Sequence, residues 1–325
     1  MASRTARHLR IMVPAAAWTA AMEDGSVRVD GLTWETAPHI EHAPERFVAT
    51  REQAYDAGEN GLRRYVIDLL AGAPPTAIPV FFSREYMHRN LLVREDSPMT
   101  SPADLAGKAI GARLTAVSGT SAAVLMVLEQ AYGVDLASLK LHMDAGRLPT
   151  NRMGLDLRPG PETDEAALEQ LLRGDVDAVI FTTGPRYWSL FGGDELDELI
   201  EAHPGIRTLV SGPDLAVDAY RRTGLYPISD LVVLSKELVE ADPEAPALLV
   251  DAFSQANDLS SQHRDAAEQA LAERELALLG EDPYRYELGA NERLNIAAYT
   301  DFFYRMGAIE RSPDPEELFV PSTVR

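Results

Sequence analysis

The sequence predicts an α/β fold built from about two domains. Apolar runs of strand length alternate with stretches of helical periodicity from Leu9 to Leu234, a pattern typical of mostly parallel sheets covered by helices on both faces. A chain of 325 residues is too long to fold around one small hydrophobic core. Beyond Leu234 the pattern is almost entirely helical, so we expect a C-terminal helical block that packs on the first domain.

Local patterns place the first elements. Residues 9–13 form an apolar run, and 27–36 alternate well enough to predict a hairpin into the second strand. A short strand over 55–59 leads into a helix over 61–70, and Glu59 lies at that joint. Later strands are predicted over 109–114, 139–143, 176–182, 206–210 and 226–234, and helices over 43–51, 121–132, 164–173, 185–191, 194–202, 243–279 (with breaks) and 291–306. The Gly- and Pro-rich segment 146–163 is predicted to be a surface insert.

Polar and titratable residues are concentrated between two apolar runs, 77–82 and 91–93. We interpret these runs as neighbouring buried strands. The connection is richer in titratable and hydrogen-bonding side chains than a turn requires, and its candidates are Ser83, Arg84, Tyr86 and His88. A solvated loop with a hydrogen-bonded histidine is the alternative.

The composition excludes several functions. The formal net charge is −21, so no overall positive field attracts a nucleic acid. The absence of cysteine excludes disulfides and thiolate catalysis. No apolar run approaches the roughly 18 residues needed to span a bilayer, so no membrane partner is predicted. The seven histidines show no metal-binding HExxH spacing. We therefore predict neither a metal nor a cofactor. Because the net charge is negative, we expect local cationic side chains to bind any anionic ligand.

The N-terminus allows two interpretations. Basic residues precede the apolar segment 11–22, as in a secretory signal. Pro14 and Trp18 interrupt that segment, and sequence typical of a folded domain follows from Asp24. We therefore expect a cytoplasmic protein.

The second half of the alternating region carries further candidates. Residues 115–120 lead into a helix, and a helix N-terminus binds anions through exposed N–H groups; helix capping explains the same hydroxyls equally well. The strand over 176–182 ends where open α/β sheets usually bind ligands. The candidate substrate-binding residues here are Ser118, Thr120, Ser121, Thr182, Thr183 and Arg186.

Five segments stand out in order along the chain: YDAGENGLRRYV, IPVFFSREYMHRNLLV, TGLYPISDLVVL, EDPYRYELGANERLN and EELFVPST. Together they resemble the 4,5-dihydroxyphthalate decarboxylase family. The resemblance covers nearly the whole chain and implies a two-lobed fold similar to type 2 periplasmic binding proteins, with the C-terminal helices on the first lobe. The lobes expected from it are 1–97 plus 226–325 and 98–225, with a ligand cleft between them.

The resemblance carries over residue by residue. Glu59, Ser83, Arg84 and His88 stand where the family pattern has them. Three places depart from it: Met87 replaces an Arg, Asp230 replaces a His, and Asn60 with Gly61 replaces a Met-Ser pair. These departures leave the identity of the acid open. Tyr226 and Asp230 complete the expected substrate-binding set.

The resemblance implies a cofactor-independent decarboxylase, a carboxy-lyase, acting on a hydroxyaromatic or related small carboxylic acid. Arg84 would grip the carboxylate with two parallel hydrogen bonds, His88 would supply the proton, and Glu59 would accept a phenolic proton or orient His88. Each has a structural alternative: an ion pair for Arg84, a packed histidine at 88, and a carboxylate at a helix N-terminus for Glu59.

Two other functions stay open at this stage. One is a solute-binding receptor of a transporter, and the other is a lyase or hydrolase of the same architecture that acts on another small anion. The acidic surface and the C-terminal tail permit a homodimer without requiring one.

Overall fold

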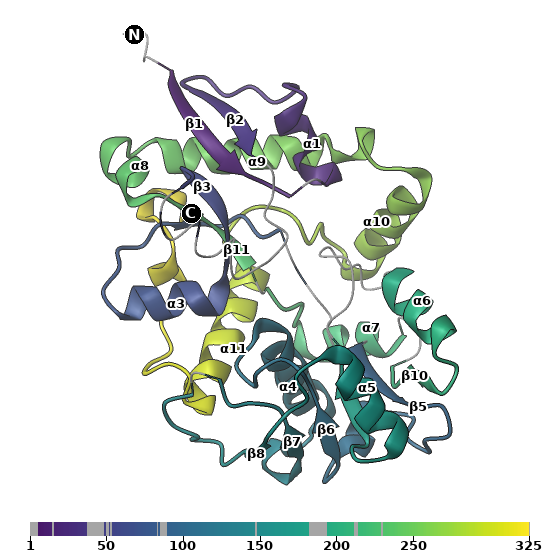
Figure 1. Cartoon of the computed structure of the whole chain (residues 1–325). Coiled ribbons are helices and arrows are strands. Elements are labelled where there is room, and N and C mark those ends of the chain that lie inside the picture. The colour runs from purple at the N-terminus through teal and green to yellow at the C-terminus, as the bar shows by residue number, and fades with distance from the viewer. Residues whose placement is uncertain are drawn as a thin grey trace. The chain divides into compact units, whose positions relative to one another are not determined.

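The computed structural model describes residues 6–14, 16–37, 49, 52, 54–82, 84, 90–146, 148–181, 194–210, 214–228 and 230–324. The chain forms two compact units (Figure 1). The first unit is made of Met1–Ser83, Asp230–Arg293 and Pro313–Arg325, and the second of Arg84–Ser229 and Leu294–Ser312. These bounds differ from the lobes expected from sequence, because 84–97, 226–229 and 294–312 belong to the second unit.

The sheet of the first unit has the strand order β2-β1-β3-β11-β4 among the described residues. β1 (Arg7–Met12) pairs in parallel with both β2 (Leu32–Ala37) and β3 (Ala57–Gly61), whereas β11 (Asp230–Leu234) is antiparallel to β3 and to β4 (Ala77–Ile78). The predicted hairpin over 27–36 is therefore wrong, since a helix, α1 (Ala17–Glu23), connects β1 to a parallel β2. The segment weighed as a secretory signal forms the end of β1 and this helix.

Helices and the C-terminal turns complete the first unit. They are α3 (Leu62–Leu70), α8 (Lys236–Ala241), α9 (Ala245–Asp258), α10 (Ala266–Leu279) and the 3₁₀ turns η4 (Ser260–Gln262), η5 (Pro315–Leu318) and η6 (Pro321–Thr323). Tyr65 of α3 ties the tail to the sheet: its hydroxyl donates to the Leu318 carbonyl at 2.5 Å and accepts the Thr76 and Ala77 N–H groups at 2.9 and 3.1 Å. Burial raises the pKa of this hydroxyl, which keeps it neutral and able to donate.

The second unit contains a sheet of order β10-β5-β9-β6-β7-β8 among the described residues. Parallel pairing joins β9 (Ala178–Ile180), β6 (Ala109–Gly111), β7 (Lys140–His142) and β8 (Asp156–Arg158); β5 (Leu91–Arg94) and β10 (Ile206–Thr208) run antiparallel to their neighbours. Its helices include α4 (Gly119–Tyr132), α5 (Asp164–Arg173), α6 (Asp194–Ala202) and α7 (Asp214–Thr223), and η2 (Pro102–Leu105) and η3 (Leu136–Ser138) are 3₁₀ turns. Sequence patterns missed β8 and α7, and β8 lies inside the predicted surface insert.

The two apolar runs around Arg84 are not neighbouring strands. The first contributes only the two-residue strand β4, which pairs with β11 in the first unit. The second becomes β5, which pairs with β9 and β10 in the second unit. The polar segment between them is thus a connection from one sheet to another. The helices predicted over 43–51 and 185–191 fall on or largely on residues outside the described part.

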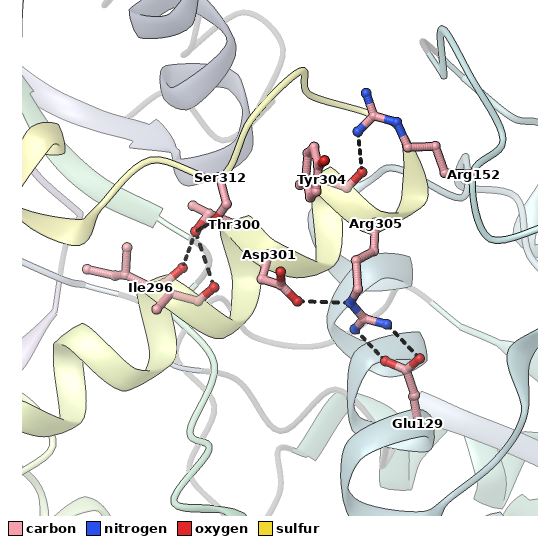
Figure 2. A network of polar contacts seen from close by, with 9 residues as sticks. Glu129, Arg152, Ile296, Thr300, Asp301, Tyr304, Arg305 and Ser312 are labelled. Carbon is pink, nitrogen blue, oxygen red and sulfur yellow. Dashed lines mark hydrogen bonds and ion pairs between the residues drawn. The ribbon is translucent and has the colours of Figure 1, made fainter.

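The last long helix, α11 (Ala290–Met306), is anchored within the second unit from Leu294 onward (Figure 2). Arg305 donates to both carboxylate oxygens of Glu129 in α4, at 2.8 and 2.6 Å, and to Asp301 at 2.9 Å. Arg152 donates to the Tyr304 carbonyl at 2.7 Å. This helix differs from the expectation that the C-terminal helices pack on the first lobe. No helix in the described part of the chain is long and apolar enough to cross a membrane.

Gly307, directly after α11, must remain glycine. Its φ is +91°, and a Cβ at this position would overlap the Thr150 carbonyl oxygen. We predict that Gly307→Ala lowers the free energy of unfolding by about 2–5 kcal/mol, the sum of left-handed backbone strain and overpacking. Urea denaturation followed by circular dichroism measures the loss.

Gly280→Ala is the matched control. Gly280 also has a positive φ, +78°, but no atom lies within 4 Å of its added Cβ. Gly280→Ala should therefore lower the free energy of unfolding by only about 1–2 kcal/mol, the cost of backbone strain alone. Equal losses for the two variants would contradict the overlap with Thr150.

Candidate active site

Arg84 is buried in the second unit beside an aromatic ring. Its side chain and that of Tyr226 are only 2% and 1% exposed. A backbone bridge links Arg84 to Ile228, and the guanidinium carbon lies 5.9 Å from the Tyr226 ring centroid, within the range of a cation–π interaction. A desolvated cation next to a flat ring can bind an anion more strongly than a surface arginine can, because little water competes for it.

Two polar residues of α11 hold this region in place. Asn295 is fully buried; its Oδ1 accepts the Tyr226 N–H at 2.7 Å and its Nδ2 donates to the Gly224 carbonyl at 3.4 Å. Tyr299 lies four residues later on the same helix face, and its hydroxyl donates to the carbonyl of Gly119, the first residue of α4, at 3.2 Å. One face of α11 therefore fixes both the Tyr226 segment and the start of α4.

The N-terminus of α4 is capped by its own side chains. Ser118 is the N-cap in extended conformation, and its Oγ accepts the Ser121 N–H at 3.1 Å and donates to Ser121 Oγ at 3.0 Å. Ser121 is fully buried, whereas Thr120 is partly exposed. The capping alternative is therefore confirmed for Ser118. Ligand binding by Ser118, Thr120 and Ser121 stays a prediction.

Two carboxylates share one face of the sheet in the first unit. Glu59 lies in β3 opposite Val232, and Asp230 lies opposite Gly61 in the same antiparallel pair. Directly paired residues and those two positions away lie on the same face, so Glu59 and Asp230 are diagonal neighbours with side-chain origins about 7–8 Å apart. Glu59 is 2% exposed and Asp230 is partly exposed. Gly61 carries no side chain that could cover Asp230.

The other candidates lie outside the described residues: Ser83, Tyr86, His88, Thr182, Thr183 and Arg186. Arg84 and Tyr226 belong to the second unit and Glu59 and Asp230 to the first, so the expected interlobe cleft stays a prediction. In the described part of the chain no group of three or more His, Cys, Asp or Glu residues could hold a metal ion.

Sequence reasoning missed Asn295 and Tyr299. Their signal was weak but present, because both are polar groups at helical spacing within a helix whose other residues include Ile296, Phe302 and Phe303. A polar side chain at a buried helix position requires a partner, and here the partners are main-chain groups of the site.

The comparisons with known proteins now decide the family. No family model matches the chain. The 4,5-dihydroxyphthalate decarboxylase of Comamonas testosteroni is 31% identical over 324 residues, covering 93% of this chain and 92% of that protein. The chain belongs to the 4,5-dihydroxyphthalate decarboxylase family. The Pseudomonas putida enzyme of the same name is 32% identical over 217 residues, covering 62% of this chain and 77% of its own. The protein is thus a carboxy-lyase, and the resemblance is confirmed.

Solved structures support the predicted fold class. A putative periplasmic sulfonate-binding protein from Methylobacillus flagellatus has a TM-score of 0.57 at 14% identity, covering 97% of this chain and 92% of its own. The MOPS-bound alkanesulfonate-binding protein SsuA from Xanthomonas axonopodis gives 0.53 at 18%, with 99% of both chains covered. DSZB in complex with biphenyl-2-sulfinic acid gives 0.55 at 17%, covering 97% and 98%. The two sulfonate-binding proteins have the periplasmic-binding-protein fold, so the α/β two-lobed class is confirmed.

We predict that Asn295→Ala lowers the free energy of unfolding by about 1–3 kcal/mol, because it leaves the buried Tyr226 N–H without an acceptor. Tyr299→Phe retains the ring and should cost about 0.5–1.5 kcal/mol, the value of one hydrogen bond. Urea denaturation of the two variants measures both losses. Wild-type stability of Asn295→Ala would contradict the bond at Tyr226.

Proposed function

We propose that the protein decarboxylates a hydroxylated aromatic carboxylic acid without a cofactor. The observation that carries the proposal is the buried Arg84 guanidinium beside the Tyr226 ring, in a chain of the 4,5-dihydroxyphthalate decarboxylase family. A guanidinium presents two parallel N–H groups to a carboxylate. An aromatic ring next to it offers an edge or a face to an aryl acid.

The reaction needs one proton and releases one molecule of CO₂. Arg84 holds the carboxylate, and Glu59 accepts the phenolic proton, which pushes electron density into the ring. His88 donates a proton to the ring carbon that bears the carboxylate. The bond between that carbon and the carboxylate then breaks, its electron pair restores the aromatic ring, CO₂ leaves, and Glu59 returns its proton to the phenolate oxygen. A positioned acid or base contributes about two to four orders of magnitude in rate.

The substrate we favour carries a single carboxylate. Glu59 and Asp230 share one face of the sheet, and a second substrate carboxylate near them would be repelled. A dihydroxybenzoate satisfies this constraint, whereas 4,5-dihydroxyphthalate, named for the relatives, carries two carboxylates.

The sequence similarity to two decarboxylases supports the expected cytoplasmic location. The homodimer stays a prediction.

The variant Arg84→Gln tests whether the Arg84 guanidinium binds the substrate carboxylate. With ¹³C-carboxylate NMR on a panel of hydroxybenzoates and 4,5-dihydroxyphthalate, we expect kcat/KM for the best substrate to fall about a hundredfold or more, because a charge-assisted bidentate pair is lost. Arg94→Gln is the matched control, since Arg94 is a half-exposed arginine of β5 paired with Asp96 at 2.8 Å. It should keep wild-type turnover.

Two outcomes would count against the role of Arg84. One is an Arg84→Gln enzyme that folds and turns over like wild type. The other is an Arg84→Lys enzyme as fast as wild type, because lysine keeps the charge but lacks the planar fork. If wild type binds acids of the panel and turns over none of them, the proposal that a hydroxylated aromatic acid is the substrate fails.

Asp230→Asn tests the substrate class. Removing this charge should raise kcat/KM for 4,5-dihydroxyphthalate relative to 3,4-dihydroxybenzoate by about tenfold, as expected for relieving repulsion across a poorly solvated site. Asp258→Asn, at an exposed position at the end of α9, should leave the ratio unchanged. A ratio that does not move in Asp230→Asn would remove Asp230 from substrate selection.

A further inference from the structure

A cavity lies within the first unit, and its described lining includes no residue of the proposed active site. Its volume is about 350 Å³, at the lower end of the range of about 300–1,000 Å³ typical of small-molecule sites. Its walls come from α9, from the loop that precedes α11 and from η6 near the C-terminus. A ligand of one ring and a short chain is the size that such a cavity accommodates.

One wall of this cavity is apolar and held in place. Tyr286 lines it and is only 4% exposed. Its ring makes edge contacts with Phe82 and Phe253, at centroid distances of 6.2 and 6.5 Å. Ala247 and Val250, one turn apart on α9, line the cavity as well. An apolar body entering the cavity therefore meets a surface whose side chains are already ordered, which lowers the entropic cost of binding.

The charges around the cavity are compensated except at one place. Arg293 lines it, but its Nε donates to Glu316 at 2.6 Å and its Nη1 donates to the Leu288 carbonyl. Glu287 forms an ion pair with Arg285. The side chain of Asp251, an exposed residue of α9, has no hydrogen bond or ion pair with any residue that the structure describes. Ser254 and Ser322 add hydroxyls to the same lining.

We propose that this cavity binds a small primary amine with an aromatic or similarly apolar body, its ammonium group on Asp251. A carboxylate beside an apolar wall favours a cation that carries hydrogen-bond donors. Asp251 is the one uncompensated charge in the described lining, so the cavity repels the aryl acids proposed as substrates. The cavity is thus a second site with the opposite charge preference.

Titration calorimetry with 2-phenylethylamine tests the proposal on the full chain. The neutral isostere 2-phenylethanol distinguishes the contribution of the ammonium charge to binding from that of the aromatic ring. We expect the amine to bind wild type, Asp251→Asn to weaken binding at least about tenfold, the loss expected for one charge-assisted hydrogen bond, and Asp258→Asn to leave it unchanged. The alcohol should bind at least about tenfold more weakly than the amine. Ala247→Phe, which fills the cavity, should abolish amine binding while the far-ultraviolet circular dichroism stays that of wild type.

Several results would overturn the proposal. They are absence of amine binding to wild type, equal affinity of amine and alcohol, and wild-type affinity in Asp251→Asn or Ala247→Phe. Loss of amine binding in Glu59→Gln would place the ammonium group on the other pair of carboxylates and overturn it too. Because the readout is binding of a cation and not release of CO₂, its failure would leave the decarboxylase proposal untouched.

Discussion

The hydrogen bond from the Tyr226 main chain to Asn295 is the constraint on which the described half of the site depends. A buried N–H without an acceptor costs about 1–3 kcal/mol, so α11 has to present this amide at this position. Tyr226 in turn forms the aromatic side of the Arg84 environment. The ion pairs of Arg305 with Glu129 fix the same helix further along. The location of Arg84, in the first third of the chain, thus depends on a helix residue more than two hundred positions later.

Local signals predicted local structure well. The helices Asp164–Arg173 and Asp194–Ala202 have the predicted bounds, and for the first of them the ends are marked by Thr163 as N-cap and by Gly174 in the left-handed region. The predicted hairpin failed because alternation of apolar and polar residues identifies a strand without naming its partner. The helix α1 was missed because its alanine-rich segment was weighed only as part of a secretory signal.

The residues of the candidate site also fall into two groups, those that a local motif identifies and those that only the fold brings together. Sequence patterns and the resemblance selected Arg84, Glu59 and the serines at the start of α4, because each stands in a compact motif. They could not find Asn295 and Tyr299, whose partners, Tyr226 and Gly119, are distant in sequence. Nor could they place Glu59 and Asp230 on one sheet face, since that relation follows from the register of an antiparallel pair. Glu59 was expected at a joint before a helix and instead lies buried within β3.

The order of strands in the first sheet has a consequence for how the chain is made. β11 lies between β3 and β4, yet the ribosome synthesises the whole of 84–229 before β11 emerges. Until then β3 and β4 expose open edges, which are templates for aggregation. The tail that bridges Ala77 through Phe319 arrives later still. A nascent chain of this topology therefore has a long interval in which chaperone protection matters, because β3 and β4 are made early and complete their pairing late.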